Sequence, residues 1–300
     1  LGSLREKGSA TSKRHRDALC KKLGTTFDTV FFESQSGVNG AKIVAEHVGD
    51  VFEKSDGAVV YKGEQDGLHT RVFLNSQGLP TYEAKEVGLF ELKHGAYPDC
   101  NMSITVTGGE QTDFFKVVFA AIRKVFPKDT EGKMLLHIAN GFLTLTTGKM
   151  SSRKGNVITG ESLISDMEAL AVEKMEGRDL ADKTQTASEI AVASIKYSVL
   201  KQGTGTSIIF DPAAALSFEG DSGPYLQYSY VRAMSVLAKA GKSKGDKIPD
   251  QVPVFERLLP RFPDVVYRAA KEYEPHFVTT YLTELAGAFN SWYAAERIIG

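Results

Sequence analysis

The residues best suited to chemistry lie in one short stretch, residues 148–156, which reads GKMSSRKGN. It holds three cations and two hydroxyls, with a glycine at or near either end. Lysine and arginine neutralise phosphate oxygens, hydroxyls and backbone N–H groups donate to them, and glycine lets the backbone approach a ligand closely. The stretch therefore suits a triphosphate whose charge must be stabilised while pyrophosphate leaves. By charge alone, a solvated basic turn would explain the same residues.

The segments before this stretch must position it, and they alternate between strand and helix patterns. The predicted strands are 29–32, 58–61, 70–74, 102–106, 135–139 and 142–145, and the predicted helices are 38–52, 81–92 and 112–125. A polar turn that contains glycine joins the second and third strands, which predicts a hairpin. Strands that alternate with helices favour an α/β layer structure.

The pattern changes from Glu161 onward, where the periodicity is almost entirely helical. The predicted helices are 162–175, 188–200, 225–240, 265–273 and 277–299, with glycine and proline between them. We therefore predict two domains, an α/β domain over 1–212 and an all-helical domain over 213–300, with the boundary between Asp182 and Pro212.

Composition bounds the class of protein. The formal net charge is -1, so any contact with nucleic acid must come from local patches. The two cysteines, Cys20 and Cys100, are too few for a disulfide framework or a four-cysteine zinc site, which favours a reducing compartment. Because no apolar run approaches the length of a membrane span and no signal peptide opens the chain, we expect no membrane partner.

The basic stretch resembles the KMSKS signature loop of class I aminoacyl-tRNA synthetases, in the KMSSRKGN form typical of many arginyl-tRNA synthetases. The match continues through Val157, Ile158 and Glu161. The resemblance implies that Lys149 and Lys154 bind ATP phosphates and stabilise the transition state. The remaining residues implied in ATP binding are Gly141, Phe142, Met150, Ser151 and Ser152. The family usually has a lysine at the position of Ser152, so the division of labour between the two lysines stays open.

The segment 80–88, PTYEAKEVG, resembles the helix that lines the arginine pocket in that family. Tyr82 and Glu86 match the family's tyrosine and acid, and a spacing of four residues puts both on one helix face. A carboxylate can bind the five donors of a guanidinium bidentately. The family usually has aspartate, one methylene shorter than Glu86. An exposed helix with a solvated Glu86 is the alternative.

Two further residues, Glu110 and Gln111, follow a predicted strand and open a predicted helix. Ligands of open α/β sheets bind at such carboxyl ends of strands. In the family an acid or amide at this place contacts the amino acid or the ribose, and the register leaves both residues as candidates. A helix N-terminus with Glu110 complementing the dipole explains them equally well.

The segment 223–228, GPYLQY, resembles the entry helix of the anticodon-binding bundle of the arginyl enzymes. Aromatic rings, amides and guanidinium groups suit stacking on unpaired bases and hydrogen bonding to their edges. The candidate tRNA-binding residues are Tyr225, Gln227, Tyr228 and Arg232. The apolar residues of this helix fit a packed core.

The resemblance implies the second half of a Rossmann-like class I nucleotide-binding fold followed by an all-α helical bundle. It also implies the activity of an arginine–tRNA ligase, with tRNA(Arg), L-arginine and ATP as partners, Mg²⁺ accompanying ATP, a monomeric state and a cytoplasmic location, with an organelle left open. The family's HIGH motif is missing from the 300 residues. We therefore predict that this polypeptide alone forms no arginyl-adenylate.

Three alternatives bear on this interpretation. A class I synthetase for another amino acid would share the signature loop. A non-catalytic synthetase-like RNA-binding or scaffold protein would suit the missing motif, but it would need no phosphate loop. A dinucleotide oxidoreductase is disfavoured because no GxGxxG follows a strand at a helix start, and the Walker pattern GxxxxGK[ST] is also absent.

Overall fold

The computed structural model describes residues 2–145, 159–177, 179–240 and 251–296. They form two compact units, which are considered separately here. The first comprises residues 27–140 and is called the α/β unit. The second comprises residues 1–26 and 141–300 and is called the helical unit. No described helix has both the length and the apolar character needed to cross a membrane.

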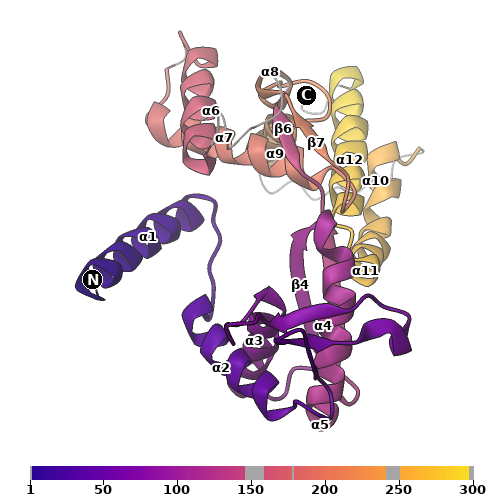
Figure 1. The fold of residues 1–300 in the computed structure, drawn as a ribbon. Helices are drawn as coiled ribbons and strands as arrows, with labels where there is room; N and C mark the ends of the chain where they lie inside the picture. Colours follow the sequence, from indigo (N-terminus) through magenta and orange to yellow (C-terminus); the bar gives the residue numbers. More distant parts are fainter. Residues whose placement is uncertain (1, 146–158, 178, 241–250, 297–300) are drawn as a thin grey trace. The chain divides into compact units, whose positions relative to one another are not determined.

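The α/β unit contains two small sheets and three longer helices (Figure 1). In chain order its elements are α2 (Glu33–Glu46), β1 (Glu53–Ser55), β2 (Ala58–Tyr61), η1 (Gly63–Asp66), β3 (Arg71–Leu74), α3 (Tyr82–Ala96), β4 (Met102–Gly108), η2 (Gly109–Gln111), α4 (Thr112–Val125), α5 (Pro127–Thr130) and β5 (Met134–Asn140). The predicted hairpin is confirmed, because β2 and β3 pair antiparallel, with β1 on the other side of β2. Strands β4 and β5 pair in parallel, in register from Met102↔Met134 to Gly108↔Asn140.

The strand predicted at 29–32 is wrong. Those residues form no strand, and the backbone of Phe32 instead opens α2. The Phe32 N–H donates to Gln35 Oε1 at 3.1 Å, and the Phe32 carbonyl accepts from the Gln35 N–H at 2.9 Å. A short run of β-branched and aromatic residues can therefore precede a helix when local hydrogen bonds are available.

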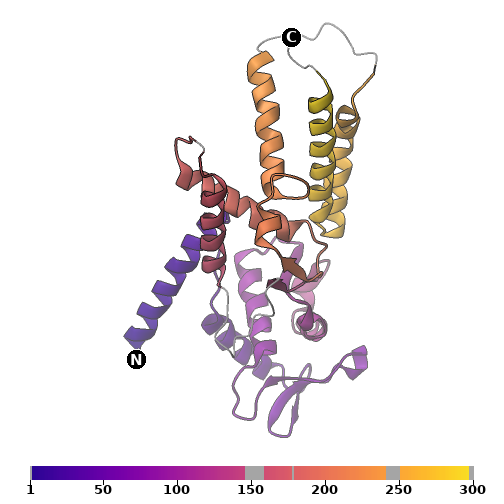
Figure 2. The same cartoon turned by 90° about the horizontal axis from the view of Figure 1, so that it is seen from above.

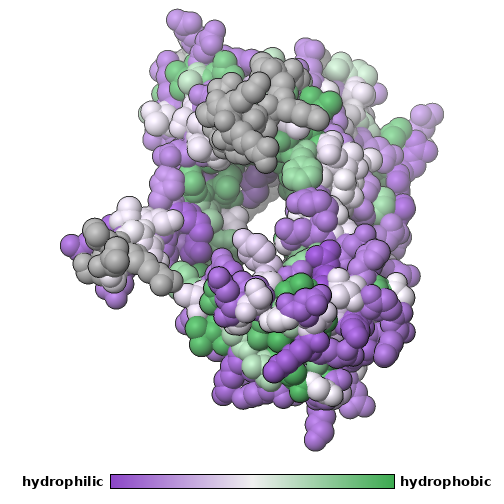
Figure 3. Space-filling model, in the orientation of Figure 1, coloured by the Kyte–Doolittle hydropathy of each residue, from purple (hydrophilic) through white to green (hydrophobic). Residues whose placement is uncertain are grey.

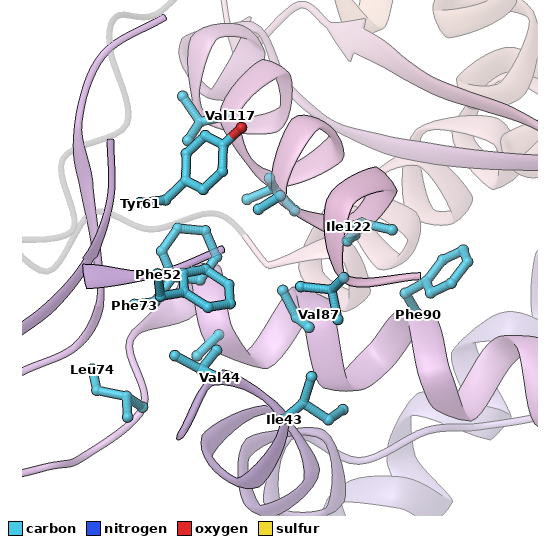
Figure 4. Close-up of a cluster of buried hydrophobic side chains, with 14 residues drawn as sticks. Ile43, Val44, Phe52, Tyr61, Phe73, Leu74, Val87, Phe90, Val117 and Ile122 are labelled. Carbon is cyan, nitrogen blue, oxygen red and sulfur yellow. The ribbon is translucent and has the colours of Figure 1, made fainter. Parts of the chain in front are cut away.

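The core of the α/β unit lies between α2, α3, α4 and the β1–β3 sheet. Figure 4 shows side chains from all of these elements converging, among them Val44, Phe52, Phe73 and Val87, each fully buried. Burial of each such side chain contributes about 1.5–3 kcal/mol of transfer free energy. The predicted amphipathic helix 112–125 coincides with α4, whose apolar stripe faces this core.

Helices α2 and α3 touch through glycines. A Cβ at Gly40 would lie 1.9 Å from the Ala84 carbonyl oxygen, and one at Gly88 would lie 2.1 Å from the Ser36 carbonyl oxygen. Because any side chain there would push the helices apart, these glycines set the position of α3 against α2. Helix α3 carries two of the predicted site residues.

The helical unit is built mainly from long helices. In chain order its elements are α1 (Gly2–Lys22), β6 (Leu143–Leu145), α6 (Gly160–Lys174), α7 (Lys183–Leu200), β7 (Ile208–Phe210), α8 (Pro212–Ala215), α9 (Gly223–Ala240), α10 (Val254–Leu258), η4 (Leu259–Arg261), α11 (Phe262–Glu272) and α12 (His276–Ala295). Strands β6 and β7 pair in parallel. One core joins α6 to α7, and α12 packs against α9 and α11 (Figure 2). The predicted helices are confirmed in kind, with shifted ends. The domain boundary predicted at 212/213 differs from the limits of the two compact units, which fall at 26/27 and 140/141. The predicted boundary divides the sequence into domains, and it stays a prediction.

Candidate functional site

The predicted phosphate loop falls in residues 146–158, outside the described residues. Lys149, Met150, Ser151, Ser152 and Lys154 therefore stay predictions. Two described elements flank the loop. Strand β6 ends at Leu145, and α6 begins after Thr159, whose hydroxyl accepts from the Ser162 N–H at 3.0 Å. The loop thus connects a strand to a capped helix N-terminus, as predicted.

Two of the predicted ATP-binding residues, Gly141 and Phe142, precede β6. A Cβ at Gly141 would lie 2.0 Å from the Thr206 carbonyl oxygen, so close backbone approach alone explains the glycine. The Phe142 carbonyl accepts from the Ile208 N–H at 2.8 Å, and the Phe142 ring is 57% exposed. The exposed ring is available to a ligand, whereas the carbonyl is already bonded.

Strand β4 follows helix α3 after a short connection. Lys93 Nζ, near the end of the helix, donates to Ser103 Oγ near the start of the strand at 3.0 Å. Tyr82 and Glu86 lie on α3, and Glu110 and Gln111 lie on η2, directly after the carboxyl end of β4. Ligands of open sheets bind at such ends, so the position of Glu110 and Gln111 fits the predicted site.

Glu86 stands out among these four residues by the pKa of its side chain. Burial raises the pKa of its carboxyl, and the nearby Lys93 ammonium partly offsets that rise. Burial in turn lowers the pKa of Lys93, which Glu86 partly restores. Within the described residues, Glu86 accepts no hydrogen bond. A half-buried carboxylate that accepts no hydrogen bond from the described residues is destabilised in the free protein and available to an incoming cation.

The other three residues differ from Glu86 in being exposed. The Tyr82 ring is 70% exposed, and the Lys85 ammonium lies 4.7 Å from its centroid while pairing with Glu33. Glu110 and Gln111 are exposed on η2, and the Glu110 carboxylate folds back so that a Cβ at Gly108 would lie 2.5 Å from it. This geometry fits both a ligand contact and a helix start.

Among the predicted tRNA-binding residues, Arg232 makes several contacts within the helical unit. Its guanidinium lies 4.4 Å from the Tyr228 ring and 4.5 Å from the Tyr293 ring, between α9 and α12. It donates to Asn290 Oδ1 at 2.8 Å and to the Tyr228 hydroxyl. Asn290 Nδ2 donates to Ser229 Oγ at 2.7 Å. Arg232 therefore holds α9 to α12.

The remaining candidates on α9 are less constrained. Tyr228 is 44% exposed, and Tyr225 is half-buried. Gln227 Oε1 is buried without a hydrogen-bond donor among the described residues. The sequence analysis missed Lys93, although its spacing of seven residues from Glu86 signals a shared helix face. It also missed Asn290, which lacks a local pattern that would link it to Arg232.

The described residues contain a parallel strand pair with helices packed against it, and polar side chains follow the carboxyl end of β4. A helical part follows in the chain. These features define an α/β nucleotide-binding fold with an added helical bundle. The family model "tRNA synthetases class I (R), catalytic domain" matches residues 41–212, more than half of the chain, and the model "DALR anticodon binding domain" matches residues 226–300. The chain therefore belongs to the arginyl-tRNA synthetase family.

Relatives and solved structures agree with this assignment. The chain is 30% identical to the arginine–tRNA ligase of Bacteroides thetaiotaomicron over 92% of its own length and 49% of the relative's. It is 32% identical to that of Treponema denticola over 91% and 49% of the two chains. The arginyl-tRNA synthetase of Thermus thermophilus superposes with a TM-score of 0.81 at 26% identity, over 97% of this chain and 57% of that one. The chain thus spans about half the length of these relatives, and the predicted family and fold class are confirmed.

Proposed function

We propose that these 300 residues serve an arginine–tRNA ligase. L-Arginine and ATP give arginyl-adenylate and pyrophosphate, and the arginyl group then passes to tRNA(Arg) with release of AMP. The arginine carboxylate attacks the α-phosphorus and pyrophosphate leaves, so the protein supplies position and charge rather than a nucleophile. The observation that carries the proposal is the match to the arginine-type catalytic family over 41–212, with Glu86 half-buried on α3 and its pKa raised by burial.

Glu86 binds the arginine guanidinium in this proposal. Its carboxylate recovers in the complex the hydrogen bonds that it lacks in the free chain, which favours a planar cation with several donors. Tyr82, one turn earlier on α3, packs its exposed ring beside the bound side chain. Glu110 and Gln111, beyond β4, contact the amino acid or the ribose. Lysine, with a point charge, would satisfy the carboxylate less completely.

The signature loop binds ATP. Lys149 and Lys154 neutralise the phosphates, with Met150, Ser151 and Ser152 in support, and Gly141 and Phe142 border the adenine. Mg²⁺ enters with ATP as its phosphate complex. We assign residues 1–212 to the catalytic part and residues 213–300 to the anticodon-binding part.

The tRNA contacts lie on α9. Tyr225, Gln227 and Tyr228 meet unpaired bases, while Arg232 supports the Tyr228 ring from behind. The protein acts as a monomer in the cytoplasm in this proposal, and light scattering of the purified enzyme checks the first of these statements.

A chimera tests the proposed function. The 300 residues replace the matched stretch of the Bacteroides thetaiotaomicron enzyme, and arginine-dependent ATP–pyrophosphate exchange is measured with tRNA(Arg) present. We expect exchange with arginine but not with lysine or glutamine, and no exchange from the 300 residues alone. Exchange that depends on a different amino acid would instead support a class I synthetase of another specificity. A chimera that folds and binds tRNA without exchange would support the non-catalytic alternative.

A further inference from the structure

Arg71, at the start of β3, has a guanidinium that contacts two helices of the α/β unit. Its Nη1 donates to Glu83 Oε1 on α3 at 3.2 Å, and its Cζ lies 5.4 Å from the centroid of the Phe114 ring on α4. Glu83 directly follows Tyr82 in the sequence. Phe114 lies three residues after Gln111. One side chain therefore contacts the first turns of both helices, and each of these turns contains or follows residues that are predicted to bind arginine.

The Arg71–Glu83 pair differs from ion pairs at the surface of this unit. Hydrophilic side chains cover much of the face of the α/β unit that Figure 3 shows, and exposed ion pairs contribute little because water and salt screen them. Lys62 and Glu53 form such a pair at 2.6 Å, with each side chain 54% exposed. The Glu83 side chain is only 12% exposed and that of Arg71 is 33% exposed, so their pair is screened less.

The type of side chain at position 71 suits a contact with two helices at once. A guanidinium is planar, so it can pair with a carboxylate through its N–H groups while its face lies against an aromatic ring. A lysine could pair with Glu83, but its ammonium has no planar face to stack on Phe114. Arg71 Nε is buried and has no acceptor among the described residues, which is a cost that a lysine would not carry. The double contact offsets this cost.

The contacts of Phe114 continue to the carboxyl end of β4. The Phe114 and Phe115 rings meet edge to face with centroids 4.9 Å apart, and the Phe115 ring stacks on that of His137 at 4.6 Å. His137 Nε2 lies 2.8 Å from Thr107 Oγ1, within hydrogen-bond distance. Thr107 is near the end of β4, and η2 follows that end. Packed side chains therefore connect the Arg71 guanidinium to the strand end that leads into η2.

The start of α3 is also attached to β3 through the backbone. The Thr81 N–H donates to the Phe73 carbonyl at 3.0 Å. Thr81 and Glu83 flank Tyr82, so the residue before Tyr82 and the residue after it are both bonded to β3. The backbone bond alone would hold the end of the helix, whereas the Arg71 contact also fixes its first turn against α4.

We propose that Arg71 is a positioning residue of the arginine site, which holds the first turn of α3 and the segment from η2 to α4 in the arrangement that binds L-arginine. Arg71 does not touch the substrate, and it acts through Tyr82 and the residues of η2. This inference rests on the proposed function, in which those residues contact arginine. A displacement of about 1 Å in an active site can cost about 100-fold in rate, so one such contact is enough to matter.

Steady-state kinetics of the chimeric enzyme test this role. In ATP–pyrophosphate exchange, Arg71→Met should raise the KM for arginine by about 10-fold and leave the KM for ATP within about twofold, because both contacts of the guanidinium are lost. Arg71→Lys keeps the charge beside Glu83 and should give a smaller rise. Lys62→Met is the matched control. It breaks the exposed pair with Glu53 on β1 and should change neither KM.

A double-mutant cycle shows whether Arg71 acts through Tyr82. Tyr82→Ala removes the ring whose position is in question. Adding Arg71→Met to Tyr82→Ala should therefore raise the KM for arginine by less than about threefold, compared with about 10-fold for Arg71→Met alone.

Hydrogen exchange of the 300-residue chain gives a second readout that needs no catalysis. The Thr81 N–H donates to the Phe73 carbonyl, and the Lys85 N–H donates to the Thr81 carbonyl at 3.1 Å. Arg71→Met should speed the exchange of these two amides by about 10-fold and leave those of β5 unchanged, because only the start of α3 is released. Lys62→Met should leave all of them unchanged.

The proposal fails on any of three results. The first is a lower maximal rate for Arg71→Met with an unchanged KM for arginine, which would make the pair with Glu83 a matter of stability alone. The second is a full 10-fold effect of Arg71→Met, or about that, in the Tyr82→Ala background. The third is faster exchange by the same factor throughout the α/β unit. A wild-type chimera without arginine-dependent exchange would instead overturn the proposed function, and hydrogen exchange would still decide whether Arg71 holds the start of α3.

Discussion

Glu86 on α3 and Arg232 on α9 are both charged residues of predicted binding helices, and their surroundings differ. Glu86 is half-buried, has a pKa raised by burial and accepts no hydrogen bond from the described residues. Arg232 lies between two tyrosine rings and donates to Asn290 and Tyr228. Glu86 therefore has no hydrogen-bond donor among the described residues, whereas Arg232 has two hydrogen-bond acceptors.

The difference separates a ligand site from a structural contact. A charge whose partners are all internal stabilises the fold and has little to offer a ligand. A buried charge without partners costs free energy in the free protein and regains it when a complementary ligand binds. We therefore expect the effect of a Glu86 variant to appear in binding and that of an Arg232 variant in stability.

The largest expected effect follows the change Glu86→Gln. In the chimeric enzyme, the KM for arginine should rise by about 100-fold, or about 2.7 kcal/mol, because a charge-assisted bidentate contact is lost. The free energy of unfolding of the 300-residue chain should stay level or increase, since the substitution removes a half-buried charge that accepts no hydrogen bond from the described residues. The control is Glu91→Gln, an exposed residue on α3 that accepts from Asn39 Nδ2 at 2.7 Å. A loss of stability with an unchanged KM for arginine would mean that Glu86 is a structural residue rather than a ligand site.

The change Arg232→Met should lower the free energy of unfolding by about 2–3 kcal/mol, because two hydrogen bonds donated by the guanidinium and two cation–π contacts are lost. Urea denaturation of the helical unit within the 300-residue chain measures it. Arg257→Met, at an exposed position on α10, should change it by less than about 0.5 kcal/mol. A double-mutant cycle with Asn290→Ala should show coupling between the two residues. Additive effects would mean that the contact contributes no interaction energy.

The pH dependence of stability should carry a contribution from Glu86. Its folded-state pKa lies above that of the unfolded chain, so the folded state holds the extra proton. This contribution is fully present below the unfolded glutamate pKa, about 4.3, and is lost as the pH rises through the folded-state pKa. The free energy of unfolding of the wild type minus that of Glu86→Gln should therefore fall as the pH rises above about 4.3. A difference that grows with pH would show that the carboxylate is paired after all.

The smallest expected effect concerns Lys93. Its positive charge lowers the pKa of Glu86, so Lys93→Met should raise that pKa further and extend the pH window to higher values. Carboxyl ¹³C NMR of Glu86 measures the midpoint. Ser103→Ala is the matched control, because it removes the partner of Lys93 but keeps the ammonium. Equal shifts in both variants would attribute the effect to the hydrogen bond rather than to the charge.

Much of the architecture could be predicted from local pattern. The periodicity of 112–125 predicted α4, and the apolar runs around a polar turn predicted the β2–β3 hairpin. The segment 29–32 shows the limit, since a four-residue run of β-branched and aromatic residues does not distinguish a strand from the segment that leads into a helix. For the site, the spacing of Tyr82 and Glu86 placed both on α3, whereas the sequence did not show that burial would raise the pKa of the Glu86 carboxyl.

By itself, the sequence determined the family, through the stretch 148–156 and the segments 80–88 and 223–228. It also determined most helices. Both follow from patterns among residues that are close in sequence. Only the tertiary structure decided which charged side chains have internal hydrogen-bond partners and which side chains of β4 are exposed. Asn290 is 58 residues from Arg232 along the chain, and Ile104 acquires its neighbour Leu136 through strand pairing. Burial and partnership depend on segments brought together by folding, so no local pattern specifies them.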